Sequence, residues 1–125
     1  MSDTEPILDD IHSTFKRVCD VYKLRGERVD DDFGFQQINL KVLNQIKLAE
    51  FIIADLTFER PNCYYEVGYA HALNKKVILT ARKGTVIHFD ISTFPVILYS
   101  SMSELEKKLK ERFEKILSNK TPTER

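Results

Sequence analysis

The chain has 125 residues, of which 42% are hydrophobic and 30% are charged, and this favours one soluble globular domain with a single core. Lys plus Arg and Asp plus Glu both number 19, so the formal net charge is zero. Bulk charge therefore gives no support for binding to nucleic acid or to an anionic membrane.

The cysteines and the N-terminus predict a cytoplasmic protein. Cys19 and Cys63 lie far apart, with neither a disulfide framework nor metal-ligand spacing, which favours reduced thiols. No apolar run approaches the roughly 20 residues needed to cross a bilayer. Residues 1–6 are acidic and lack the character of a signal peptide. We expect no metal and no cofactor.

The first predicted element is an amphipathic helix over residues 7–23, where apolar side chains recur at helical spacing. Gly26 follows it as a stop signal. Residues 27–30 could form a short strand that ends in three consecutive aspartates. These carboxylates favour a solvated turn over a metal site, because neighbours in a strand alternate in direction. A more specific hypothesis is that Asp30 or Asp31 points inward and binds a ribose hydroxyl.

The central part of the chain is predicted to alternate helices and strands. Helical spacing returns over residues 36–49. The apolar, β-branched run 51–56 is typical of a buried parallel strand. A helix rich in small residues is predicted over 61–73, with Pro61 near its first turn, and a second buried strand over 77–80.

The final part of the chain begins with a predicted loop over residues 82–94, in which Lys83 and Gly84 form a turn signal. A third apolar strand is expected over 95–99. Residues 102–118 are predicted to form a strongly amphipathic closing helix, and the polar tail 119–125 to be disordered.

Strands that alternate with helices predict right-handed crossovers and a parallel sheet covered on both faces. We therefore predict a single α/β domain over residues 1–118, a flavodoxin-like three-layer sandwich with four to five strands. The usual first strand is missing, because the chain opens with a helix. Either the sheet has four strands, or the leading strand lies outside this sequence, or another chain supplies it.

Glu66 is the strongest functional signal, because it is the only acid or base in its predicted helix apart from His71. A bare carboxylate is costly to bury, so Glu66 must meet water, a partner or a substrate. Ligands of such sheets bind beyond the carboxyl ends of the strands. Residues 30–32, residues 55–62 and the loop after Thr80 all fall at that edge of the predicted sheet.

Four segments of the chain resemble the nucleoside 2-deoxyribosyltransferase-like superfamily in order and spacing. They are Ile-Ile-Ala-Asp-Leu-Thr at 52–57, Arg-Pro-Asn at 60–62, Tyr-Glu-Val-Gly-Tyr-Ala-His-Ala-Leu at 65–73 and Lys-Val-Ile-Leu at 76–79. That superfamily includes deoxyribosyltransferases, deoxynucleotide N-hydrolases and TIR-like nucleotide-binding proteins. Residues 27–31 are similar to the second-strand segment of the TIR-like members, and the resemblance covers roughly residues 7–99.

The resemblance implies that Glu66 is the nucleophile that attacks the anomeric carbon, and that Asp55 helps to shape the sugar and base site. A second group must protonate or orient the leaving base, and Asp55 or Asp31 is expected in this catalytic role. The resemblance also implies a site completed across a subunit contact, and hence a homodimer or higher oligomer. Two features of the sequence differ from those of the enzymes. The leading strand with its substrate loop is absent, and residues 60–65 stand where the transferases often have Asp and Gly. Asp55 could instead accept backbone N–H groups of the next loop.

Arg60, Asn62 and Tyr65 are further candidates for substrate binding, and each has a structural alternative. Glu66 could pair with Arg60 or Arg82 rather than act on a sugar. Asn62 could cap the start of its helix. Tyr65 and the neighbouring tyrosines could pack in a core or at a subunit contact.

Three hypotheses follow for the function. The first is an enzyme that cleaves or transfers the N-glycosidic bond of a nucleoside, nucleotide or NAD-like molecule. The second is a non-catalytic TIR-like module that binds a nucleotide in signalling. The third is self-association through the tyrosine-rich helix and its small residues Gly68, Ala70 and Ala72. All three predict small-molecule or self partners, without nucleic acid or membrane.

Overall fold

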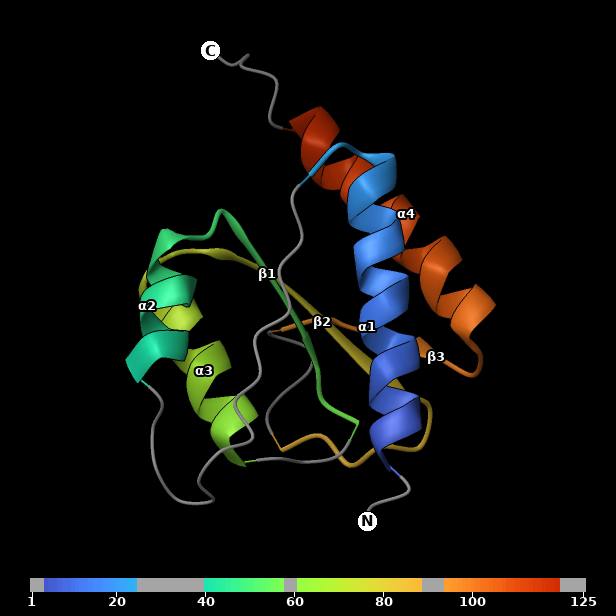
Figure 1. The fold of residues 1–125 in the computed structure, drawn as a ribbon, viewed down its shortest axis with the longest axis horizontal. Coiled ribbons are helices and arrows are strands. Elements are labelled where there is room, and N and C mark those ends of the chain that lie inside the picture. The colour runs from blue at the N-terminus through green and yellow to red at the C-terminus, as the bar shows by residue number, and fades with distance from the viewer. Residues whose placement is uncertain (1–3, 25–39, 58–60, 89–93, 120–125) are drawn as a thin grey trace. The chain divides into compact units, whose positions relative to one another are not determined.

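The structure is a computed structural model that describes residues 4–24, 40–57, 61–88 and 94–119 (Figure 1). The chain divides into two compact units: residues 1–26 with 99–125, and residues 27–98. The elements in chain order are α1 (Thr4–Val21), α2 (Leu40–Leu48), β1 (Phe51–Asp55), α3 (Pro61–Ala72), β2 (Lys76–Arg82), β3 (Val96–Tyr99) and α4 (Met102–Asn119).

Helices α1 and α4 lie side by side in the first unit, although they stand at opposite ends of the chain (Figure 1). The apolar spacing seen in the sequence is the cause, because it gives each helix one buried stripe. The Tyr22 ring, just after α1, contacts the Phe113 ring of α4 at 5.5 Å between centroids. The buried residues that share this spacing are Ile11, Phe15 and Val18 on α1, and Leu105, Leu109 and Phe113 on α4.

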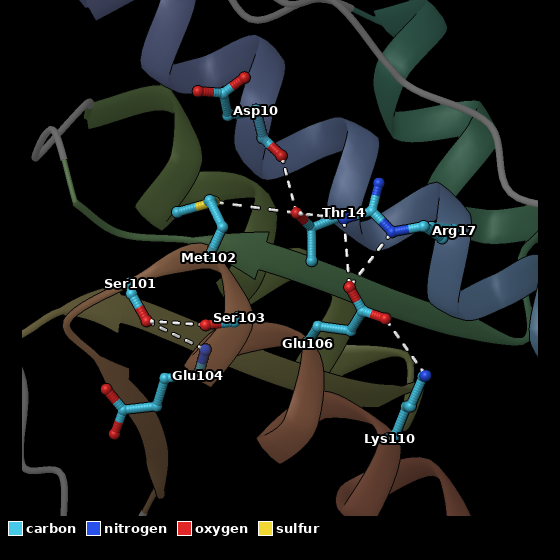
Figure 2. A network of polar contacts seen from close by, with 9 residues as sticks. All are labelled: Asp10, Thr14, Arg17, Ser101, Met102, Ser103, Glu104, Glu106 and Lys110. Atoms are coloured by element: carbon cyan, nitrogen blue, oxygen red, sulfur yellow. Dashed lines mark hydrogen bonds and ion pairs between the residues drawn. The ribbon is translucent and has the colours of Figure 1, made fainter.

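One ion pair joins the polar edges of the same two helices, and a second lies within α4 (Figure 2). Arg17 of α1 donates to one oxygen of Glu106 at 3.2 Å, and Lys110 contacts the other oxygen at 3.2 Å. Hydrogen bonds from Lys110 and Arg17 hold the pKa of the Glu106 carboxyl below its ordinary value. The hydroxyl of Tyr22 donates to Glu114 at 2.9 Å, and its pKa is raised by desolvation and by that bond.

Helix α4 begins at the N-cap residue Ser101, and Glu104 at the third helical position reaches back past it to Ser100. The Ser101 hydroxyl oxygen accepts a hydrogen bond from the Glu104 backbone N–H at 3.1 Å, as Figure 2 shows. The Glu104 carboxylate in turn accepts from the Ser100 N–H at 2.7 Å. The side chain of Ser101 thus satisfies one of the backbone donors that a helix start leaves without an intrahelical partner.

Helix α1 ends at a residue in the left-handed region, Lys23, whose φ is 58°. The Leu24 N–H donates to the Cys19 carbonyl at 2.8 Å, which is the bond of a Schellman motif that spans six residues. The helix therefore stops before Gly26, which lies outside the described residues. Helix α3 ends in the same way at Asn74, whose φ is 60°.

The three strands form one parallel sheet in the order β1-β2-β3. Strands β1 and β2 pair in a register that runs from Phe51 opposite Lys76 to Asp55 opposite Thr80. The central strand β2 is buried from Ile78 to Ala81. Strand β1 was predicted to be buried but is half-buried throughout. Among the described residues, β2 is the one strand that pairs with β1.

Helices α2 and α3 pack against one face of this sheet through two apolar clusters. The cluster shared by α2 and α3 contains Val42, Leu43, Ile46 and Ala70, with Ile52 and Val77 of the sheet beneath it. The cluster beneath the first half of α3 contains Leu56, Val67, Leu79 and Ala81.

The α/β class, the parallel sheet and the four predicted helices are confirmed. The strand number is wrong for the described residues, which form three strands rather than four to five. The predicted strand 27–30, with Val29 as its one apolar side chain, lies outside those residues. The predicted turn at Gly84 is present, with a φ of 93°. None of the described helices is both long and apolar enough to cross a membrane.

Candidate functional site

Asp55 is the last residue of β1, and its carboxylate is held by two hydrogen-bond donors. Oδ1 accepts from the Thr57 backbone N–H at 3.0 Å, and Oδ2 accepts from the Thr80 hydroxyl at 2.6 Å. The structural alternative weighed for Asp55, acceptance from the next loop, is therefore seen at Thr57. Both bonds fix the carboxylate as an acceptor at the carboxyl end of the strand.

Two threonines form hydrogen bonds at this strand end, and neither was predicted to be a site residue. Thr80 is completely buried, and its carbonyl accepts from the Leu56 N–H at 2.8 Å. The Thr57 hydroxyl oxygen accepts from the Arg82 N–H at 3.1 Å. The available signal was the parallel pairing of the two strands, which places Thr80, a polar residue in an apolar run, opposite Asp55.

The Asp55 side chain lies on the sheet face opposite to α2 and α3. Ala54 and Leu56, its neighbours in the chain, both pack in the cluster under α3. Because side chains alternate along a strand, Asp55 projects to the other face, where it meets Thr80. Asp55 and helix α3 thus lie on opposite faces of the sheet near its carboxyl edge.

Glu66 lies in the second turn of α3 and is half-buried. Tyr69 and Ala70, three and four positions later, both pack in the cluster shared with α2. Residues at this spacing lie on the same side of a helix, so Glu66 is on the flank of α3 that faces α2. Val67, the next residue, is buried under the helix together with Leu56, which brings this turn of α3 against the end of β1.

The other predicted site residues are only partly described. Tyr65 is 50% exposed on the outer side of α3. The backbone of Asn62 lies inside the first helical turn, after Pro61, which occupies the first helical position that proline favours. Arg60, Asp30 and Asp31 lie outside the described residues.

Two aromatic pairs join α3 to the connection between β2 and β3, and neither pairing could be predicted from the sequence. The Tyr64 and His88 rings meet edge to face with 5.6 Å between their centroids. The backbone N–H of His88 also donates to the Tyr64 hydroxyl oxygen at 3.4 Å. The His71 ring stacks on Phe94 at 4.4 Å with 23° between the planes. His71 is therefore a stacking residue within the chain.

Among the side chains that the structure describes, the outward side of α3 carries no charged group. Tyr65 and Leu73 are 50% and 38% exposed, and Gly68 and Ala72 are exposed between them. A Cβ atom added to Gly68 would meet nothing within 4 Å. The missing side chain of Gly68 therefore leaves a shallow, uncharged surface.

The site combines a fixed acceptor carboxylate at the end of a parallel strand with a half-buried carboxylate on the helix that follows. Comparison of the sequence with known protein families and with curated proteins gave no match in either case.

Proposed function

We propose that the protein cleaves or transfers the N-glycosidic bond of a nucleoside, nucleotide or NAD-like molecule. One observation carries this proposal: Asp55 is fixed by two hydrogen bonds at the carboxyl end of β1, and the next helix in the chain, α3, bears the half-buried Glu66. The carboxyl edge of a parallel sheet is where such folds bind ligands. The resemblance of residues 52–79 to the deoxyribosyltransferase-like superfamily supports the same reaction class.

Glu66 supplies the nucleophile in this proposal. Its carboxylate oxygen attacks the anomeric carbon as the bond from that carbon to the base nitrogen breaks. The electron pair leaves with the base, which takes a proton from water. Water or a second base then attacks the anomeric carbon, releases the product and restores the Glu66 carboxylate. Water as acceptor gives hydrolysis, and a second base gives transfer.

Asp55 acts as a sugar-orienting group rather than as the proton donor. Both of its oxygens already accept hydrogen bonds, so its place in the reaction is to accept one more from a sugar hydroxyl. Positioning of this kind contributes to catalysis, because a reacting carbon must sit close to its nucleophile.

The direct test incubates the protein with a panel of nucleosides, nucleotides and NAD, and follows the free base by chromatography. We expect release with at least one member of the panel, and a loss of about 100-fold or more in Glu66→Gln. Glu111→Gln is the matched control, because Glu111 is exposed on α4 in the other unit. Absence of release with every substrate, or full release by Glu66→Gln, would contradict the proposal.

A covalent intermediate gives a second test of the same step. Acid quenching during turnover, followed by mass spectrometry, should detect a glycosyl group on the peptide that contains Glu66. The Glu66→Gln protein is the control, and it should carry no such group. A glycosyl group on another peptide would remove Glu66 from the nucleophile role.

The uncharged outer side of α3 favours a second candidate function, nucleotide binding coupled to self-association. Tyr65 is half exposed there and Gly68 opens onto free space. Under this alternative, a nucleotide raises the melting temperature while remaining intact. Tyr65→Glu lowers the mass measured by light scattering, whereas Val86→Glu, at a 58% exposed position in the β2–β3 connection, leaves it unchanged. A monomer at high concentration would exclude this alternative.

A further inference from the structure

We propose that the β2–β3 connection positions Glu66 by packing against α3 through four aromatic residues, which we name the aromatic clasp. The clasp is defined here as Tyr64 and His71 on α3 together with His88 and Phe94 in the connection. The inference rests on the proposed function, since it assigns positioning residues to the same site. Its members touch one another at 5.6 Å and 4.4 Å between ring centroids.

The clasp engages one flank of α3 over two turns. Tyr64 and His71 are seven positions apart, so they lie on nearly the same side of the helix. Tyr64 and Phe94 also pack on the buried cluster that contains Leu56 and Val67. The connection therefore contacts α3 at two positions along the helix, and it packs on the same apolar cluster as the helix does.

Glu66 lies on the other flank of the helix. It follows Tyr64 by two positions, which corresponds to a rotation of about 200° around the helix axis. That flank faces α2 through Tyr69 and Ala70. Helix α3 is thus held between α2 on one side and the clasp on the other. The clasp acts on Glu66 through the orientation of the helix, and its rings are positioning residues.

The orientation of α3 determines where the Glu66 carboxylate stands relative to a bound sugar. A displacement of about 1 Å at a reacting atom can cost roughly 100-fold in rate. Loss of a clasp ring should therefore lower kcat by about 10-fold to 100-fold. KM should change by less than about 3-fold, because the binding groups at the end of β1 stay in place.

His71→Leu and His71→Phe form the decisive pair of variants. The leucine removes the ring that stacks on Phe94, whereas the phenylalanine keeps a ring in the same place. We expect low kcat in His71→Leu and near-normal kcat in His71→Phe. Phe94→Leu should reproduce the loss from the other side of the stack. Val86→Ala is the control, since Val86 is exposed in the same connection and outside the clasp.

Amide hydrogen exchange of α3 gives a readout that does not depend on activity. We expect the α3 amides of His71→Leu to exchange at least about tenfold faster than those of His71→Phe, because local opening follows the loss of packing. If the wild-type protein releases no base, the proposed reaction fails and this comparison alone judges the clasp. Equal exchange in the two variants would then overturn it.

If the wild-type protein is active, kcat decides. Unchanged kcat in both His71→Leu and Phe94→Leu would overturn the inference while leaving the proposed reaction intact. Equal loss in His71→Leu and His71→Phe would also overturn it, because the ring would then not be the cause. Each assay is run well below the melting temperature of the variant, so that unfolded protein does not imitate a loss of rate.

Discussion

The Thr80 hydroxyl donates a 2.6 Å hydrogen bond to Oδ2 of Asp55, across the last register pair of two parallel strands. Thr80 is completely buried, so its hydroxyl depends on this acceptor. The same bond therefore stabilises the sheet and orients the carboxylate at the candidate site.

Thr80→Val should destabilise the protein by about 2 kcal/mol, because it removes a buried hydrogen bond to a charged group. Urea denaturation measures the change in the free energy of unfolding. In the Asp55→Ala background the same valine should cost close to nothing, since the buried hydroxyl has already lost its acceptor. An equal cost in both backgrounds would show that Thr80 acts independently of Asp55.

Ser101→Ala should destabilise α4 by about 1 kcal/mol, the usual cost of losing an N-cap side chain. The loss follows because the Glu104 N–H then has no side-chain acceptor at the helix start. Thermal denaturation is a sufficient measurement. Ser103→Ala on the same turn is the control and should cost less than about 0.5 kcal/mol. A larger loss at Ser103 would contradict the capping role of Ser101.

Glu106 should give a pH-dependent contribution to stability. Its pKa is lowered from an ordinary value of 4.5 by Lys110 and Arg17, so the folded state favours the ionised carboxylate. A depressed folded pKa stabilises above the unfolded pKa, and the contribution is lost as pH falls through the folded pKa. The melting temperature of the wild type should therefore exceed that of Glu106→Gln at pH 7 and approach it below pH 4.5.

The Glu106 contribution is also expected to be small and sensitive to salt. Arg17 is 54% exposed at its side chain, and exposed ion pairs are screened by solvent. Sodium chloride at about 1 M should reduce the difference between the two proteins at pH 7. A difference that widens as the pH falls would contradict the sign of the pKa shift.

Cys19 should react slowly with disulfide reagents in the folded protein. Its pKa is raised by burial and then by the charge of Asp20, with Lys16 opposing, and the thiolate is the reactive form. We expect a rate at pH 8 at least about tenfold below that of the unfolded chain. A Cys63→Ser background isolates the signal. Equal rates in native and denaturing buffer would argue against a buried thiol.

The sequence predicted the elements whose apolar spacing also decides their burial. Helix α4 is the clearest case, since its apolar spacing predicted one buried stripe and Leu105, Leu109 and Phe113 are buried. Strand β2 was likewise predicted from an apolar run that is buried in the centre of the sheet. Periodicity works here because the same spacing that defines the element also defines its contact face.

Pairings between distant residues were not predictable in the same way. The bond between Thr80 and Asp55 depends on the strand register, and the stack of His71 on Phe94 depends on the path of a loop. Helix ends at Lys23 and Asn74 use the left-handed region without glycine, which propensity alone does not predict. The proposed roles of Glu66 and Asp55 stay predictions.

The pairing of α1 with α4 has a consequence for how the chain is made. Helix α1 ends at Val21 and its partner begins at Met102, so roughly 80 residues are synthesised before the two can meet. At cellular elongation rates this delay lasts about 4 to 16 seconds. During that interval the apolar face of the nascent α1 lacks its packing partner α4, and exposed apolar surface of this kind is what ribosome-associated chaperones bind.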